Sequence, residues 1–282
     1  MKILRPLTIG LLSLSIAISL FIGYSDHSMK QTIQGFEQRI ISSAKSFSLP
    51  DATEIQALPQ PVQRYFAFTF PNGFPEQKQY VVVKMQGMFR RPLTQSFEPT
   101  TARQVASFTR PDMVFSASTP IFGPIWADVY DRFIEGEMQM EAKLLSAFSV
   151  VHEDKNPSLN QTSLRRWLLE SPTYPMALLP GGIVTWHAID DTHALAVASA
   201  YGIKAELIAT FGPNGELLSF DATKPGDLTT PYHGSGERVS RSDFQLVNNI
   251  RLPMSFEISR VGKDAIAHPF WRAKITDIHF AP

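Results

Sequence analysis

Residues 205–223 read AELIATFGPNGELLSFDAT and predict two antiparallel strands joined by a tight turn. Pro213 fixes its backbone angle φ, and Asn214-Gly215 readily adopts the positive φ that such a connection needs. The apolar and β-branched residues on both sides are typical of strands. The stretch therefore favours a fold built on an antiparallel sheet.

Alternation of polar and apolar residues extends this pattern in both directions. VTWHAIDDTHALAV, residues 184–197, predicts a second hairpin that turns at Asp190-Asp191. LVNNIRLPMSFEISR and FWRAKITDIHF, residues 246–260 and 270–280, add two strands, with Asn248-Asn249 as a turn. Toward the N-terminus, strands with one wet and one dry face are predicted in residues 78–90 and 125–145.

Helices are predicted near the start of the chain and once in the middle. LPQPVQRYFAFTF, residues 58–70, predicts a short helix with Val62, Tyr65 and Phe66 turned inward. The expected fold is therefore α+β: a large curved antiparallel sheet, half-barrel-like, with a few covering helices, preceded by an N-terminal transmembrane helix. The sequence has no βαβ alternation and no Gly-rich phosphate loop, which argues against nucleotide enzymes of the P-loop or dinucleotide type.

Composition narrows the function classes. The 282 residues are 44% hydrophobic and 18% charged, which is ordinary for a globular protein. Basic and acidic residues balance at 26 each, and no basic run follows a phosphate backbone, so no nucleic-acid partner is expected. The absence of cysteine excludes thiol nucleophiles, disulfides, cysteine-type zinc sites and iron–sulfur clusters.

The first 25 residues predict a membrane anchor or a signal segment. Lys2 and Arg5 precede an uncharged stretch from Pro6 to Ser25, about the length that crosses a bilayer core. A cleaved secretory signal shares the positive start and is the alternative. In both cases the body is expected outside the cytoplasm, as a single-pass protein of the cell membrane if the segment is retained.

The rest of the chain divides into two parts. Residues 26–50 predict an amphipathic connecting helix whose stripe, Ile33, Phe36, Ile40, Ala44 and Phe47, docks on the body or lies along the membrane surface. Residues 51–282 are expected to form a single β-rich extracytoplasmic domain.

Residues 164–180, LRRWLLESPTYPMALLP, predict a helix that ends at Ser171-Pro172, followed by an extended apolar run held by prolines. Trp167 shares the apolar face, and Arg166 and Glu170 lie one turn apart on a face expected to be exposed. An exposed pair contributes only about 0.3–0.5 kcal/mol. Three interpretations are open: a structural collar, a polar lip where Arg166 meets a ligand's acidic group, or a catalytic helix.

Three motifs carry a resemblance. RWLLE followed by P and ALLP, LPQPVQRYF, and GER...LP...F in residues 236–256 resemble an uncharacterised bacterial family of membrane-anchored proteins, a domain of unknown function. The similarity runs from about residue 55 to the C-terminus. That family often has Trp-Pro after the helix, where this chain has Tyr174-Pro175. The expected sheet also resembles, more loosely, the half-barrel of periplasmic lipoprotein-sorting and lipid-carrier proteins.

Methionines in the predicted strands suggest an apolar groove. Met85, Met88, Met138 and Met140, with Phe89, suit a cavity that accepts variable apolar ligands, because methionine is unbranched and polarizable. They suit an ordinary packed core equally. With Arg166, Trp167 and Glu170 they are the candidate site residues.

Two chemical alternatives have weaker signals. His187, Asp190, Asp191 and His193 have metal-ligand chemistry, but Asp-Asp also suits a turn, and no metal or cofactor is expected. A glycosidase needs two carboxyl groups flanking a cleft, and a solvated strand face explains the carboxylates equally well: Asp128, Asp131, Glu135, Glu137 and Glu141.

The sequence therefore favours a membrane-anchored extracytoplasmic protein that binds an apolar or lipid-like ligand, or a partner's apolar surface, without chemistry. The alternatives are an envelope scaffold with a filled core and an uncharacterised hydrolase. A cavity lined by methionine and phenylalanine would favour the binder, and a filled core would favour the scaffold.

Overall fold

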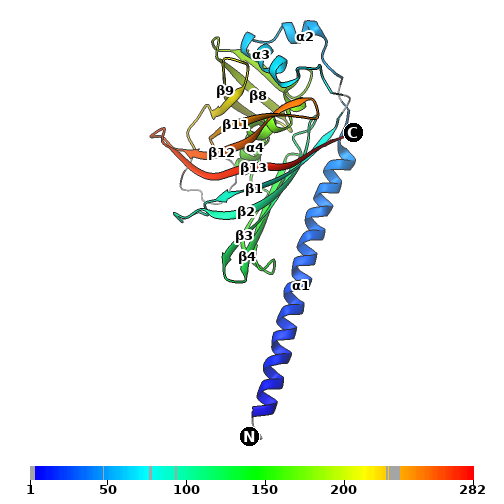
Figure 1. The fold of residues 1–282 in the computed structure, drawn as a ribbon, viewed down its shortest axis with the longest axis vertical. Coiled ribbons are helices and arrows are strands. Elements are labelled where there is room, and N and C mark those ends of the chain that lie inside the picture. The colour runs from blue at the N-terminus through cyan, green and yellow to red at the C-terminus, as the bar shows by residue number, and fades with distance from the viewer. Residues whose placement is uncertain (1–3, 47, 76–77, 93, 227, 229–235) are drawn as a thin grey trace.

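The computed structural model describes residues 4–46, 48–75, 78–92, 94–226, 228 and 236–282, with side chains from residue 10 onward. Its centre is one curved 13-stranded antiparallel sheet that does not close (Figure 1). The helices are α1 Leu4–Ser43, α2 Ala52–Gln56, α3 Gln60–Thr69 and α4 Pro157–Glu170. The strands are β1 Tyr80–Phe89, β2 Glu98–Ser107, β3 Met113–Phe122, β4 Ile125–Ile134, β5 Glu137–Leu144, β6 Phe148–Asp154, β7 Val184–Ala188, β8 His193–Ala200, β9 Ile203–Phe211, β10 Leu217–Ala222, β11 Arg238–Val247, β12 Ile250–Val261 and β13 Ala267–Ala281.

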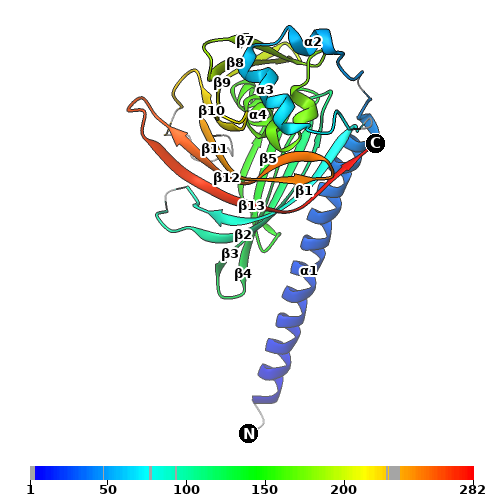
Figure 2. The same ribbon diagram turned by 45° about the horizontal axis from the view of Figure 1, so that its top comes forward.

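The sheet consists of two meanders. Strands β1 to β6 follow one another toward one edge, and strands β13 back to β7 toward the other, so that β1 and β13 pair in the middle. α4 connects β6 at one edge to β7 at the other, and it packs against β4, β5, β8, β9 and β11. We call the meander β1–β6 the first arm and the meander β7–β13 the second arm. Figure 2 places α4 between the two arms. The predicted α+β fold with a large curved sheet is confirmed.

The turns that local chemistry predicted are present. The β9–β10 turn contains Gly215 at a φ of 100°, where an added Cβ would lie 2.5 Å from the carbonyl oxygen of Arg64 in α3. Glycine is therefore needed there for both conformation and packing. Asn248 and Asn249 connect β11 to β12 with φ values of 50° and 64°, and Asp190-Asp191 lies between β7 and β8.

The middle helix corrects one prediction. α4 begins after Asn156, whose side chain accepts from the backbone N–H groups of Ser158 and Leu159. The apolar run after it is not extended, because Ser171–Thr173 and Pro175–Leu178 form two 3-10 turns. A proline in a first helical turn already has the φ that such a turn requires.

α1 runs without a break from the predicted anchor into the predicted connecting helix and ends at Ser43, before the predicted end at residue 50. Its second half docks on the face of β2–β4 opposite α4, which we call the outer face; the face toward α4 is the inner face. Ile40 packs there against Val105, Val114 and Ile134, and Glu37 accepts from Arg103 at 2.7 Å. Phe36 and Ile40 of the predicted stripe thus pack against the body, and Phe47 lies outside the described residues.

The first half of α1 is different. Every residue from Gly10 to Phe21 is exposed, including Leu11, Leu14, Ile16, Ile18 and Leu20. Figure 1 shows this part of the helix extending past the sheet. Within the part of the chain that the structure describes, no helix combines the length and the apolarity of a membrane span.

Candidate functional site

The predicted exposure of Arg166 and Glu170 is wrong. Both side chains are buried, at 5% and 8% exposure, because the polar face of α4 rests on β4 and not on solvent. Arg166 donates from Nε to Glu170 Oε1 at 2.9 Å and from Nη1 to Asp131 Oδ2 of β4 at 2.6 Å. Its guanidinium carbon also lies 4.6 Å from the ring centroid of Phe115. Two carboxylates therefore already bind the Arg166 side chain, which in the lip interpretation would meet a ligand's acidic group.

Burial and neighbouring charges both shift the pKa values in this cluster. Burial opposes the charged form of Arg166, but the adjacent Glu170 and Asp131 outweigh it and raise the pKa of the guanidinium. Burial raises the pKa of Asp131, and Arg166 only partly offsets that effect. The cluster is therefore a buried ion network in which the single guanidinium of Arg166 bridges two carboxylates.

Trp167 lies in the same turn of α4 and is fully buried, as predicted. Its Nε1 donates to the carbonyl oxygen of Ser107 at 3.1 Å. The hydroxyl of Tyr174 donates to the carbonyl oxygen of Trp167 at 2.7 Å. These contacts connect the helix to β2 and to the turns that follow it.

The quoted motifs meet in space. Glu237, from the GER motif, accepts from Arg165 of α4 at 3.0 Å and from Arg260 of β12 at 3.1 Å. Arg241 of β11 donates to the carbonyl oxygen of Leu169, and burial lowers the pKa of its guanidinium. These two residues were not among the candidates, although one of them lies in a quoted motif. Together they connect α4 to the second arm of the sheet.

The methionines do not line a shared groove. Met85, Met138 and Met140 are 4%, 1% and 5% exposed and belong to the main hydrophobic core. Met88 is 40% exposed, and its position three residues after Met85 places it on the other face of β1. Phe89 returns to the inner face, where its ring lies 6.3 Å from that of Trp271. Beneath α4, the inner face is therefore a filled core.

Beyond α4, toward the β3–β4 turn, the side chains of the inner face are smaller. A row of directly paired residues crosses five strands, and a second row lies beside it, nearer the β3–β4 turn. Small apolar residues and threonines predominate. We call these rows the small-residue strip: Ala102, Ala117, Val129, Ala142 and Val151, then Gly87, Thr100, Thr119, Ala127 and Leu144.

The small-residue strip is only partly covered. Ala117, Val129 and Val151 are half-buried and pack at the margin of the main core. The hydroxyl oxygens of Thr100 and Thr119 lie 2.8 Å apart and satisfy each other. Both threonines are buried, at 5% exposure each, so neither leaves an unpaired hydroxyl in the strip.

Trp271 of β13 borders the strip, and Gly87 makes room for it. A Cβ on Gly87 would lie 2.8 Å from the indole ring and 2.3 Å from the carbonyl oxygen of Arg272. The ring of Phe115 lies 6.4 Å from that of Trp271. An aromatic border thus separates the strip from the ion network of Arg166.

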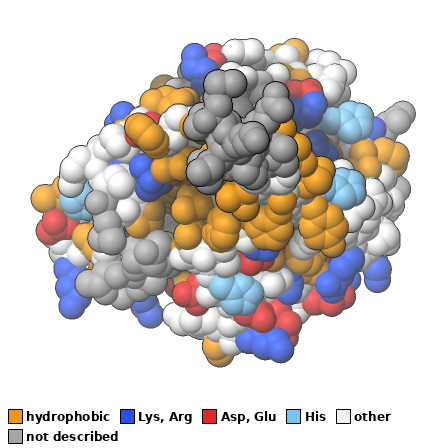
Figure 3. All heavy atoms as spheres, turned by 90° about the horizontal axis from the view of Figure 1, so that it is seen from below, with side chains coloured by type: hydrophobic (Ala, Val, Ile, Leu, Met, Phe, Trp, Pro, Cys, Tyr) orange, Lys and Arg blue, Asp and Glu red, His pale blue; other side chains and the backbone are white. Residues whose placement is uncertain are grey.

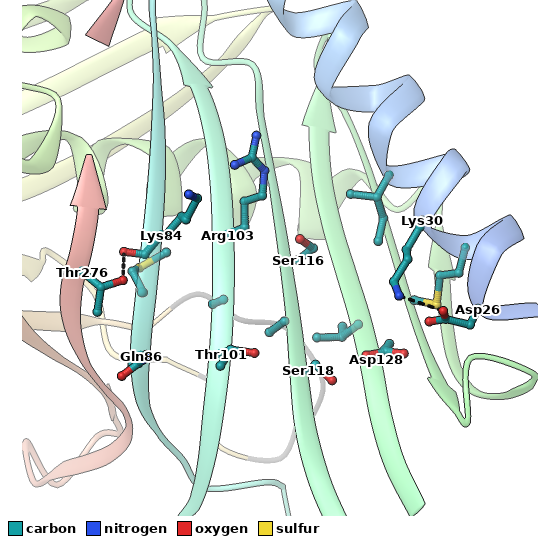
Figure 4. A pocket seen from close by; sticks show the side chains of 16 residues that line it. Asp26, Lys30, Lys84, Gln86, Thr101, Arg103, Ser116, Ser118, Asp128 and Thr276 are labelled. Carbon is teal, nitrogen blue, oxygen red and sulfur yellow. Dashed lines mark hydrogen bonds and ion pairs between the residues drawn. The ribbon is translucent and has the colours of Figure 1, made fainter. Parts of the chain in front are cut away.

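The outer face carries a groove of about 390 Å³ between α1 and strands β1–β4 (Figure 4). Its charged side chains already have partners. Lys30 pairs with Asp26 at 2.7 Å, Lys84 with Asp277 at 2.9 Å, and Arg103 with Glu37. Most of the groove's surface is nevertheless apolar, and Met29 and Ile33 of α1 contribute to it.

The remaining candidates have structural roles. Asp190 accepts from the backbone N–H groups of Thr192 and His193 at 2.8 Å, and the first of these bonds is the largest cause that lowers its pKa to about 2. Asp190 thus stabilises the β7–β8 turn. Among the described residues, no group of three metal-binding side chains occurs. Asp131 faces α4, whereas Glu141, on the outer face, accepts from Tyr130.

Comparison with known proteins places these features in a family. Residues 56–280 match the model of a family of unknown function, DUF6920. A solved DUF1329 family protein from Desulfovibrio piger is similar at 8% identity and a TM-score of 0.38, covering 83% of this chain and 94% of that one. A β-barrel-like DUF1849 protein from Brucella abortus is similar at 8% identity and a TM-score of 0.26, covering 73% and 98%. No curated protein matches the sequence.

Proposed function

Because the chain belongs to DUF6920, a family of unknown function, we propose its function from geometry. It is a membrane-attached, extracytoplasmic protein that binds an apolar or lipid-like ligand against the small-residue strip, without performing chemistry. The match to an uncharacterised family agrees with the resemblance in the motifs and carries no activity.

The observation that supports this proposal is the arrangement of two apolar surfaces. The exposed apolar half of α1 and the strand ends beyond the small-residue strip point toward the same end of the molecule (Figure 1). Figure 3, seen from that end, shows hydrophobic side chains gathered in the middle of the face. A ligand that leaves a membrane at that end would therefore reach the ends of the strands that carry the strip, on the face opposite α1.

Exposure and charge support the proposed attachment. The residues of α1 from Gly10 to Phe21 contain no charged side chain and are exposed. Burial of apolar surface is worth about 25 cal/mol per Å², so this segment gains free energy in a lipid or against an apolar partner. Lys2 and Arg5 favour a cytoplasmic N-terminus, which leaves the body outside.

The scaffold alternative has an observation of its own. Met85, Met138 and Met140 are buried in the main hydrophobic core, as expected of a filled core. In that case the small-residue strip binds nothing, and the ion network of Arg166 fixes the position of α4.

Matched substitutions separate the two functions. Ala117→Phe fills the strip, whereas Ser118→Phe places the same ring on the outer face one residue later. The ring at position 117 takes the space of the ligand, so bound phospholipid should fall about tenfold in Ala117→Phe, which corresponds to about 1.4 kcal/mol of binding free energy, and stay unchanged in Ser118→Phe. Native mass spectrometry of the detergent-extracted chain measures this occupancy. Equal occupancy in both variants, or no lipid on the unmodified chain, would favour the scaffold.

A further inference from the structure

The β3–β4 turn has an unusual surface. Residues 120–126 read PIFGPIW and contain no charge. Phe122 is 80% exposed and Ile125 is 36% exposed, and both lie beside Gly123, whose φ is 53°. This tight turn therefore exposes two apolar side chains at its tip.

The β5–β6 turn repeats this composition. Residues 144–151 read LLSAFSVV and also contain no charge. Phe148 is 57% exposed and Val150 is 54% exposed. The two turns lie at the same end of the antiparallel strands, because each follows a strand that runs in the same direction.

Turns at the opposite end of the same strands differ. The β2–β3 turn contains Arg110 and Asp112, and the β4–β5 turn contains Glu135. Arg110 pairs with Asp112 at 3.1 Å. Of these four turns, the two at one end therefore carry charges, and the two at the other end carry exposed apolar side chains.

The apolar turns are continuous with α1. The ring of Phe21, at the end of the exposed apolar segment, lies 6.2 Å from the ring of Phe148. The next charged residue of α1 after Phe21 is Asp26, five residues later. The β3–β4 turn points toward the N-terminal end of α1 in both ribbon views (Figure 1, Figure 2). The boundary between apolar and charged surface thus falls at one level on the helix and on the sheet.

We propose that the β3–β4 and β5–β6 turns insert into the surface of the same lipid bilayer that receives α1. Phe122, Ile125 and Phe148 then form a second contact with the membrane, which stops the body from rotating about the helix. Aromatic and aliphatic side chains on an uncharged loop suit this interfacial position. The nearby β1–β2 connection contributes Arg90 and Arg91, which favour acidic headgroups. This inference rests on the proposed attachment of α1.

The absence of cysteine makes the test direct. Phe122→Cys and Phe148→Cys are labelled with a polarity-sensitive NBD fluorophore in the full chain and reconstituted into phosphatidylcholine vesicles. Ile189→Cys is the matched control, because Ile189 is 50% exposed in the β7–β8 turn. We expect a blue shift and quenching by doxyl-labelled lipid at positions 122 and 148, and neither at position 189.

Vesicle flotation distinguishes this proposal from the attachment on which it rests. Chains that float without quenching at positions 122 and 148 would overturn the insertion of the turns and leave the attachment of α1 intact. Chains that do not float would overturn both. Self-quenching at position 122 that rises with protein density and ignores the lipid quencher would instead indicate a second copy of the chain at this surface, and would overturn the proposal.

Discussion

Arg166→Ala is expected to destabilise the folded chain by about 3–5 kcal/mol, because it leaves Asp131 and Glu170 buried without a counter-charge. Asp131 and Glu170 are 7% and 8% exposed, so water does not replace the lost donors. The burial that raises the pKa of Asp131 then acts without the opposing effect of Arg166. Urea unfolding followed by tryptophan fluorescence measures the loss.

Arg39→Ala is the matched control for this prediction. Arg39 pairs with Glu135 at 3.1 Å, but the two side chains are 53% and 58% exposed. A pair in that setting contributes less than about 1 kcal/mol. Similar small losses in both variants would show that the Arg166 network is solvated and that its burial is incorrect.

Trp167→Ala is expected to cost about 3–5 kcal/mol, the range for removing a buried aromatic ring. The indole is fully buried, and its ring centroid lies 6.0 Å from that of Tyr174. Removal also leaves the carbonyl oxygen of Ser107 without this donor. Thermal or urea unfolding of the purified chain reports the change.

Phe148→Ala serves as the control for the loss of an aromatic ring. Because Phe148 is 57% exposed, its removal should change the free energy of unfolding by less than about 0.5 kcal/mol. A Trp167→Ala variant as stable as Phe148→Ala would contradict the role of α4 as the central packing element of the sheet.

These two positions show that the collar interpretation of residues 164–180 describes the segment best. Trp167, Arg166 and Glu170 all hold α4 against the sheet, and none of them reaches the outer surface. The lip interpretation fails at Arg166 because Asp131 already binds it at 2.6 Å. Any ligand role therefore moves from α4 to the small-residue strip beyond it.

Local chemistry explains which elements could be predicted. Pro213, Gly215 and the Asn248-Asn249 pair fix their turns by backbone conformation alone, and the hairpins follow from the sequence. β2 and β3 have weaker signals, because the polar Thr100 and Gln104 lie on the inner face of β2 and the apolar Val114 lies on the outer face of β3. Their position depends on pairing with β1 and β4.

The contacts of Arg166 depend on residues that are distant in the sequence. Asp131 precedes Arg166 by 35 residues, and nothing in the local sequence pairs them until α4 crosses β4. Met88 and Met85 cannot line one groove, because the two-residue period of a strand places them on opposite faces of β1. The small-residue strip has no signal in the sequence, because its members come from separate strands and become neighbours only through the register of the sheet.

Both proposals depend on attachment of the body to the outer side of a membrane through α1, and one measurement tests this directly. A reporter active only outside the cytoplasm is fused after Pro282, and the membranes are washed with carbonate. We expect an active reporter, retention in the membrane pellet and an intact N-terminal peptide. Cytoplasmic reporter activity, release by carbonate or a trimmed N-terminus would contradict the account.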